Sequence, residues 1–211
     1  MARIVLLSDP RIAAVTVKDC GEPLVDLRTV AALRVDDRRA DPAGAYAHVR
    51  AGVVDLLVTA QSLLDRGLRL LVVEGYRPPA LQARYFREYL DQLRAVHPAW
   101  SAARLRERTS RYVAPPEVAP HVCGAAVDLT LVDVRGTELP MGTDVNTDPA
   151  VSHLLADIPA AARANRRILS TALGTAGFVN DPTEWWHWSY GDQYWAFMTG
   201  RDAARYGPVP D

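Results

Sequence analysis

The predicted helices and strands of this chain do not alternate in the regular order that builds a parallel, doubly wound sheet. Apolar residues recur at three- and four-residue spacing over 45–66, which predicts an amphipathic helix that ends at Gly67. A short apolar run at 68–73 then predicts a buried strand, followed by a turn at Pro78-Pro79. This order of elements favours an α+β fold, in which helices pack on a small, mainly antiparallel sheet.

The other helix and strand patterns agree with this fold class. Further helical patterns lie at 80–95, 101–112 and 160–176. The charged residues of the first two favour a solvated face with local ion pairs over a ligand-binding stripe. Gly177 ends the third, which we expect to be the last helix. Alternating side chains at 127–134 predict a half-buried strand, and the aromatic run 185–190 predicts a closing strand.

The 211 residues fit one large domain, and neither an internal repeat nor a low-complexity linker divides them. We expect a single domain over 1–211, with a core of about 20–198 between a short N-terminal segment and a C-terminal tail. The 24 basic and 25 acidic residues give a net charge of −1, so the chain lacks the excess of basic residues that a nucleic-acid partner requires. This balance favours a small ligand.

Neither a membrane span nor a disulfide framework is predicted. The longest uncharged stretch, 168–180, is shorter than the roughly 20 apolar residues that cross a bilayer. Asp9 and Pro10 interrupt the first apolar run before the core of a signal peptide can form. Cys20 and Cys123 are too far apart in the sequence for a CxxC pair. We therefore expect a cytoplasmic protein with reduced thiols.

Two histidines have a carboxylate nearby, in the motifs H-V-C-G-A-A-V-D and E-W-W-H. Gly124 permits the bend that would bring His121 and Asp128 to one ion, and His187 would complete the set. Three protein ligands leave one tetrahedral position open, which is the arrangement of a catalytic zinc. Taken alone, each motif is also consistent with a buried histidine that is hydrogen-bonded to an acid.

Glu184 is the candidate general base, because a carboxylate beside the zinc could accept the proton of an attacking water. Residues three apart in a regular strand point to opposite faces. Glu184 and His187 can therefore face one metal only if a turn or bulge intervenes. Pro182 and Thr183 predict such a turn.

Arg77 lies at the end of the predicted strand, in E-G-Y-R-P-P. A planar cation held there could stabilise an oxyanion in a cleft, or it could pair with Glu74 in a purely structural role. Cys123 stands close to His121, where it could be a ligand or a nucleophile. A small buried side chain is the favoured interpretation, because no activating neighbour is visible in the sequence.

These motifs give the chain a resemblance to a known family. The matching segments are V-D-L-R at 25–28, G-Y-R-P at 75–78, H-x-x-G-x-A-x-D-L-T-L at 121–131, L-P-M-G at 139–142, N-R-R at 165–167, G-F at 177–178 and E-W-W-H at 184–187. In this order and spacing, the sequence resembles the zinc D-alanyl-D-alanine dipeptidases of the vancomycin-resistance type. These enzymes belong to the wider zinc DD-peptidase and hedgehog-like superfamily.

The resemblance implies a hedgehog/DD-peptidase-like fold and one Zn²⁺ per chain, held by His121, Asp128 and His187. It also implies Glu184 as the general base and Arg77 as the cation on the tetrahedral intermediate. The implied partner is a small peptide substrate, with no nucleic acid and no membrane. The sequence does not define an oligomeric state.

Two departures from the family pattern concern the substrate. Ala119 stands where the family has a serine two residues before the first zinc ligand. Asn146 stands at the ungapped position of an aspartate that holds the free amino group of the dipeptide. We therefore expect Asn146 and Asp144 to bind substrate, with Asp148 as a further candidate to supply the missing charge.

The function expected from these residues is hydrolysis of D-alanyl-D-alanine to two D-alanines by a zinc-held water. One alternative keeps the zinc hydrolase but changes the substrate to another small peptide, a cell-wall fragment or a natural-product intermediate. The other is a zinc-binding module without catalytic activity. The presence of Glu184 and Arg77 beside all three zinc ligands argues against the last alternative.

Overall fold

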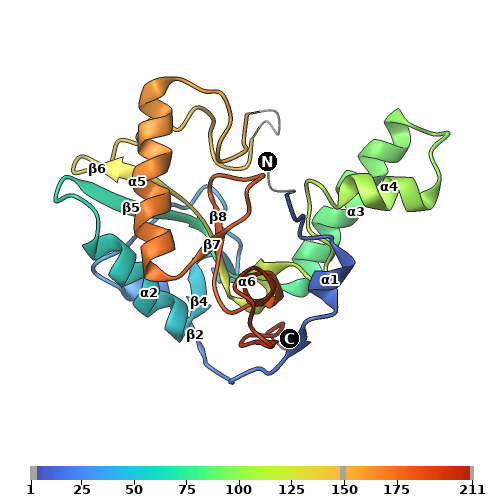
Figure 1. Cartoon of the computed structure of the whole chain (residues 1–211), viewed down its shortest axis with the longest axis horizontal. Helices are drawn as coiled ribbons and strands as arrows, with labels where there is room; N and C mark the ends of the chain where they lie inside the picture. Colours follow the sequence, from blue (N-terminus) through green and yellow to red (C-terminus); the bar gives the residue numbers. More distant parts are fainter. Residues whose placement is uncertain (1–3, 148–150, 210–211) are drawn as a thin grey trace.

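The computed structural model describes residues 4–147 and 151–209, and a five-stranded sheet with the strand order β3-β5-β6-β8-β7 crosses its centre (Figure 1). The strands are Arg34–Val35 (β3), Leu68–Glu74 (β5), Ala126–Asp133 (β6), His187–Ser189 (β8) and Val179–Asn180 (β7). Within this sheet β3 and β5 pair in parallel, and all other neighbours are antiparallel. The predicted α+β fold with a small, mainly antiparallel sheet is confirmed.

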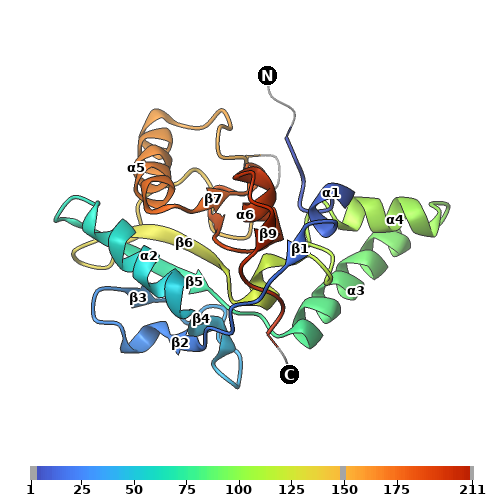
Figure 2. The same ribbon diagram turned by 60° about the horizontal axis from the view of Figure 1, so that its bottom comes forward.

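Two smaller sheets, each of two strands, lie outside the central sheet. Strand β1 (Thr16–Val17) pairs in parallel with β9 (Ala203–Ala204), which brings segments near the two ends of the chain together (Figure 2). Strand β2 (Leu24–Asp26) pairs in antiparallel fashion with β4 (His48–Arg50). Three short 3-10 helices connect these elements: Leu27–Thr29 (η1), Ala45–Ala47 (η2) and Pro120–Cys123 (η3).

The α-helices lie on both sides of the central sheet (Figure 1). They are Pro10–Ala13 (α1), Ala51–Ser62 (α2), Pro79–Val96 (α3), Ala102–Thr109 (α4), Ala160–Ala176 (α5) and Gln193–Met198 (α6). Helices α2 and α5 contact each other over the sheet, whereas α3 and α4 form a pair at the other end of the molecule. No helix of the described segments is long and apolar enough to cross a membrane.

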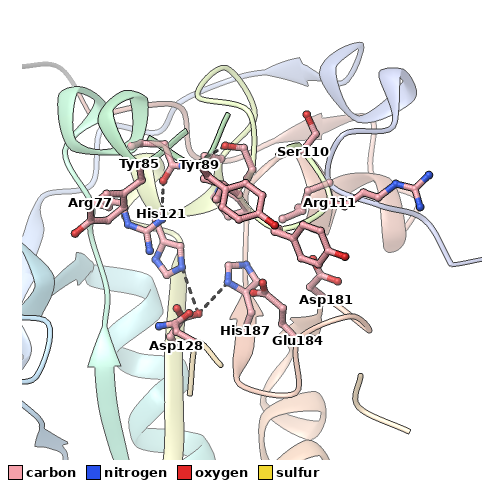
Figure 3. Close-up of a pocket in the computed structure, with 18 of the residues that line it drawn as sticks. Arg77, Tyr85, Tyr89, Ser110, Arg111, His121, Asp128, Asp181, Glu184 and His187 are labelled. Carbon is pink, nitrogen blue, oxygen red and sulfur yellow. Dashed lines mark hydrogen bonds and ion pairs between the residues drawn. The ribbon is translucent and has the colours of Figure 1, made fainter. Parts of the chain in front are cut away.

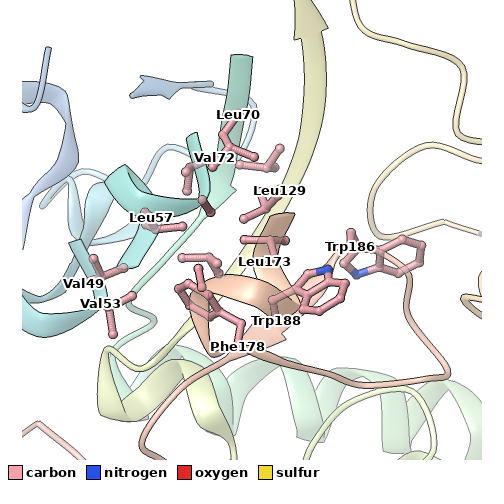
Figure 4. Packing of buried hydrophobic residues seen from close by; sticks show 14 of the residues in the cluster. Val49, Val53, Leu57, Leu70, Val72, Leu129, Leu173, Phe178, Trp186 and Trp188 are labelled. Carbon is pink, nitrogen blue, oxygen red and sulfur yellow. The ribbon is translucent and has the colours of Figure 1, made fainter. Parts of the chain in front are cut away.

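The hydrophobic core fills the space between the sheet and helices α2 and α5 (Figure 4). Val127, Leu129 and Leu131 alternate along β6 toward this core, and Leu57 and Leu173 reach it from the two helices. Burial of such apolar side chains contributes roughly 1.5–3 kcal/mol each. The alternation also directs the residues between them to the opposite face of β6, where the functional site lies.

The helix predicted over 45–66, with its end at Gly67, is wrong at both ends, because helix α2 extends only over Ala51–Ser62 and its C-cap is Leu63. Residues 48–50 form β4, which pairs with β2, and α2 begins only at Ala51. The apolar spacing continues through both elements, because Val49 and Val53 enter the same core from a strand and from a helix. A strand pairing with a segment more than twenty residues away is not visible in local periodicity.

Three other sequence predictions need correction. Strand β6 is buried on both faces rather than half-buried, because the core covers one face and the site the other. The closing strand is limited to His187–Ser189, since a turn occupies 185–186. The helix that ends at Gly177 is not the last, because the short α6 follows it.

Candidate functional site

Strands β6 and β8 place two residues of the site side by side. Asp128 and His187 are directly opposite in the antiparallel register, so their side chains leave the sheet on the same face. Nδ1 of His187 lies 3.0 Å from Oδ1 of Asp128, and both side chains are buried. Asp128 takes this position because the adjacent Val127 and Leu129 face the core.

The loop before β6 brings His121 to the same carboxylate oxygen. Pro120 begins the 3-10 helix η3, and Gly124 ends it in the left-handed conformation, with φ of +62°. Nδ1 of His121 donates to the carbonyl oxygen of Gly75 at 2.6 Å, and Nε2 lies 3.3 Å from Oδ1 of Asp128. The bend expected at Gly124 is therefore present.

Replacing Gly124 by alanine is expected to lower the free energy of unfolding by about 1–3 kcal/mol. An added Cβ would lie 2.4 Å from Cδ2 of Leu24, on a backbone that L-residues rarely adopt. Urea unfolding measures the loss. The control is Gly67→Ala, because a Cβ at Gly67 meets nothing within 4 Å. An equal effect of the two substitutions would contradict the prediction.

The two histidines and the aspartate fit a divalent metal ion. One ligand atom from each of His121, Asp128 and His187 lies within 4.8 Å of the other two, and all three side chains are buried. The separations of 3.0 and 3.3 Å are near the edge of a zinc tetrahedron, which is about 3.3 Å for zinc bonds of about 2.0–2.1 Å. The carbonyl partner of His121 is typical of histidines that bind metals.

The charge of Asp128 makes this buried position attractive to cations. Burial raises the pKa of Asp128, but the charges and hydrogen bonds of His121 and His187 outweigh burial and hold it well below its usual range. Burial lowers the pKa of His187, yet its hydrogen bond and ion pair with Asp128 raise it to about 9. A metal ion that binds these residues would displace this proton.

A turn carries Glu184 to the same side of the sheet as His187. The amide of His187 donates to the carbonyl of Glu184 at 3.1 Å, and the amide of Glu184 donates to the carbonyl of Asp181 at 2.9 Å. The turn predicted from Pro182 and Thr183 is confirmed, and it resolves the objection that residues three apart face opposite ways. Burial, and next the charge of Asp181, raise the pKa of Glu184 to about 8.

Arg77 pairs with Glu74 and also lines the cavity. Its Nε and Nη2 donate to both carboxylate oxygens of Glu74, at 2.7 and 2.6 Å. Its Nη1 donates to Oε1 of Gln82 at 2.6 Å, and Tyr85 packs against the guanidinium plane. These partners fix the plane of the cation at the wall of the cavity.

The site opens into a cavity of about 620 Å³ (Figure 3). Arg77 lines it on one side of the two histidines and Glu184 on the other. A second cavity of about 470 Å³ adjoins the first and shares walls with it at Tyr89, Asn146 and Glu184. The chain thus places a cluster that could hold a metal ion, a carboxylate and a fixed cation around one cavity.

Comparison with known proteins agrees with this arrangement. The sequence profile of a family described as D-ala-D-ala dipeptidase matches residues 26–202. A D-alanyl-D-alanine dipeptidase of Synechocystis is 31% identical, over 88% of this chain and 88% of that protein. The chain belongs to the D-Ala-D-Ala dipeptidase family. This confirms the resemblance inferred from the motifs, and it makes the protein a metallopeptidase.

Two further relatives of the D-Ala-D-Ala dipeptidase family match over shorter segments. One from Streptomyces coelicolor is 35% identical over 59% of this chain and 63% of its own length. One from Escherichia coli is 32% identical over 57% of this chain and 54% of its own length. Both relatives are named D-alanyl-D-alanine dipeptidase.

The residues expected to bind substrate lie in different surroundings. Asn146 lines both cavities, and its φ of +62° is uncommon for a residue other than glycine. Asp144 is exposed and lies outside the lining of either cavity. Asp148 lies outside the residues that the structure describes. Ala119, at the family's serine position, lines the larger cavity.

Cys123 is a buried free thiol, and Cys20 is an exposed one, as the sequence predicted. Burial raises the pKa of the Cys123 thiol far above its usual range. A thiol in this state is a poor nucleophile and a poor metal ligand, which agrees with its interpretation as a small buried side chain.

Sequence reasoning missed several residues of the site. Gln82, Tyr85 and Tyr89 line the cavity from one face of α3, a helix whose charge pattern favours ion pairs and a solvated face over a ligand-binding stripe. Their spacing of three and four residues was the available signal. Asp181 was also missed, although it lies in the turn signal before Glu184.

Proposed function

We propose that this protein is a zinc-dependent dipeptidase that hydrolyses D-alanyl-D-alanine to two molecules of D-alanine. The observation that carries the proposal is the convergence of His121, Asp128 and His187 beside Glu184 in one cavity. The names of the relatives support this substrate, and the donor set of two imidazoles and a carboxylate supports zinc as the metal. The cytoplasmic location stays a prediction from the sequence.

When bound, zinc acts as a Lewis acid on the scissile carbonyl and lowers the pKa of water toward about 7. His121, Asp128 and His187 would hold it. Glu184 accepts the proton of the attacking water and returns it to the leaving amine. The turn at 181–187 serves this role, because it ties the backbone of Glu184 to that of His187.

Arg77 stabilises the oxyanion that develops on the scissile carbonyl. Three of its N–H groups donate to Glu74 and Gln82. An arginine has five N–H donors, so one remains on each terminal nitrogen for the substrate. Donors that are fixed before the reaction stabilise the transition state without reorganisation.

Replacing Arg77 by lysine is expected to lower kcat by about 10²-fold while zinc content stays unchanged. A lysine keeps the charge but cannot bind both oxygens of Glu74 and face the substrate with a planar donor pair. Kinetics of D-alanine release and elemental analysis of zinc check this result. An unchanged kcat would show that Arg77 has only a structural role, through its ion pair with Glu74.

A second candidate is a zinc peptidase for a longer peptide or a cell-wall fragment. The size of the cavity favours it, because about 620 Å³ falls in the range of drug-sized ligands, roughly 300–1,000 Å³. The free dipeptide is smaller than such ligands. Ala119 and Asn146, which depart from the family pattern, also belong to this cavity wall.

Hydrolysis of a small panel of peptides by zinc-loaded protein separates the two candidates. The panel contains D-Ala-D-Ala, L-Ala-L-Ala and an N-acylated tripeptide that ends in D-Ala-D-Ala. We expect kcat/KM for D-Ala-D-Ala to exceed the others by about 100-fold or more. Faster hydrolysis of the tripeptide would favour the second candidate, and no hydrolysis of D-Ala-D-Ala would overturn the first.

A further inference from the structure

Asp181 is held between two residues of the proposed catalytic site. Its carbonyl accepts the amide of Glu184 at 2.9 Å, and its amide donates to the carbonyl of His187 at 3.1 Å. Its side chain is buried, with 4% exposed, and lines the same cavity as these two residues. Figure 3 shows it beside Glu184, on the side of the histidines away from Arg77.

Only one of the two carboxylate oxygens of Asp181 accepts hydrogen bonds from described residues. Oδ1 accepts the amide of Thr183 at 2.9 Å and its hydroxyl at 2.7 Å, which fixes the orientation of the group. No described residue donates a hydrogen bond to Oδ2. Asp181 is only 4% exposed, and a carboxylate with so little contact with water is costly unless a donor or a cation meets its second oxygen at the cavity wall.

The other carboxylates that line the larger cavity are engaged elsewhere. Among the described residues these are Glu88, Asp128 and Glu184. Asp128 lies in the metal cluster, and Glu184 is the proposed base. The side chain of Glu88 is 59% exposed and faces Arg84 at 3.6 Å. Asp181 is therefore the carboxylate left to neutralise a cation in the cavity.

The substrate supplies such a cation. A free dipeptide at neutral pH carries an ammonium group, since the pKa of an α-amino group is about 8. The amide oxygen of Asn146 can accept a hydrogen bond from it but cannot neutralise it. Arg77 lies on the other side of the metal cluster, so Asp181 and Arg77 place opposite charges on the two sides of the histidines.

We propose that Asp181 binds the ammonium group of the dipeptide and so makes the enzyme specific for substrates with a free amino terminus. This inference rests on the proposed function. Asp181, in the 181–187 turn, then supplies the negative charge that the neutral amide of Asn146 lacks. The same turn then sets the distance between the amino end of the substrate and the base Glu184.

The substitution Asp181→Asn tests the inference, because the amide keeps the shape and an oxygen for Thr183. The readout is the ratio of kcat/KM for D-Ala-D-Ala to kcat/KM for N-acetyl-D-Ala-D-Ala, which has no ammonium group. This ratio should fall by roughly 30-fold or more. Any general effect on Glu184 or on folding changes both substrates alike and cancels in the ratio.

A binding measurement supplies an independent readout. In the Glu184→Gln background, where turnover is blocked, calorimetry should show Kd for D-Ala-D-Ala rising by a similar factor when Asp181→Asn is added. The matched control is Glu88→Gln, which removes a charge from the same cavity and should leave both the ratio and Kd unchanged.

The outcomes separate this inference from the proposed function. An unchanged ratio and an unchanged Kd in Asp181→Asn would overturn the inference, while D-Ala-D-Ala hydrolysis by the wild-type protein would keep the proposed function. The inference would also fall if Asp148→Asn or Asp144→Asn lowered the ratio and Asp181→Asn did not. Absence of D-Ala-D-Ala hydrolysis by the wild-type protein would overturn both.

Discussion

Replacing Glu184 by glutamine is expected to lower kcat for D-Ala-D-Ala by on the order of 10³-fold while one zinc stays bound per chain. Glutamine has nearly the same shape, so the turn that leads to His187 and the metal cluster should persist. It has no basic oxygen that can take the proton of the attacking water. D-alanine release measures kcat, and elemental analysis measures zinc.

The control for this substitution is Glu88→Gln, which changes an exposed carboxylate at the rim of the same cavity. It should retain wild-type kcat. Full activity of Glu184→Gln would remove Glu184 from the mechanism. Loss of zinc together with activity would instead show that Glu184 supports the metal rather than the proton transfer.

Removing either histidine of the cluster is expected to release the metal. His121→Ala or His187→Ala should weaken zinc binding by more than about 100-fold, since even outer partners of metal ligands contribute about 10–100-fold. Two remaining ligands cannot hold zinc in the presence of a competing chelator. Titration with a chromophoric chelator measures the affinity, and circular dichroism checks that the fold is retained.

The matched control is His97→Ala, because His97 stacks on Trp100 at 3.8 Å and lies outside the lining of both cavities. Its zinc affinity should equal that of the wild type. If His121→Ala and His187→Ala also kept wild-type affinity, the cluster would be a structural pair of histidines on Asp128.

Local sequence signals predict the elements that depend on local chemistry. The helix 160–176 ends as expected, because Gly177 has a φ of +106° that glycine adopts without a steric penalty. The alternation of apolar residues around Asp128 correctly predicts that its side chain faces away from the core. Pro182 and Thr183 likewise predict the turn before His187.

Local sequence patterns do not predict features that depend on residues far apart in the chain. The periodicity of 45–66 predicts helix where β4 lies, because the pairing of β4 with β2 leaves no trace in this pattern. The sequence leaves open whether Arg77 pairs with Glu74 or faces a cleft, and the structure has it do both. The turn signal that contains Asp181 does not indicate a site residue, because its place in the cavity depends on walls that other elements build.

The family resemblance predicts more of the candidate site than spacing alone does. Histidine and aspartate seven residues apart at His121 and Asp128 are equally consistent with a structural pair. Physical evidence for a metal comes from the third residue, His187, which strand pairing brings to the same oxygen of Asp128. Two imidazoles and a carboxylate that converge in a buried place are a ligand set that could hold a metal ion.

The most direct test of the central claim is the rate of D-alanine release from D-Ala-D-Ala as zinc is returned to chelator-treated protein. We predict no turnover without metal and full turnover at one equivalent of zinc, with the Glu184→Gln protein binding the same equivalent and remaining inactive. Turnover by the metal-free protein, or none by the zinc-loaded protein, would contradict the account.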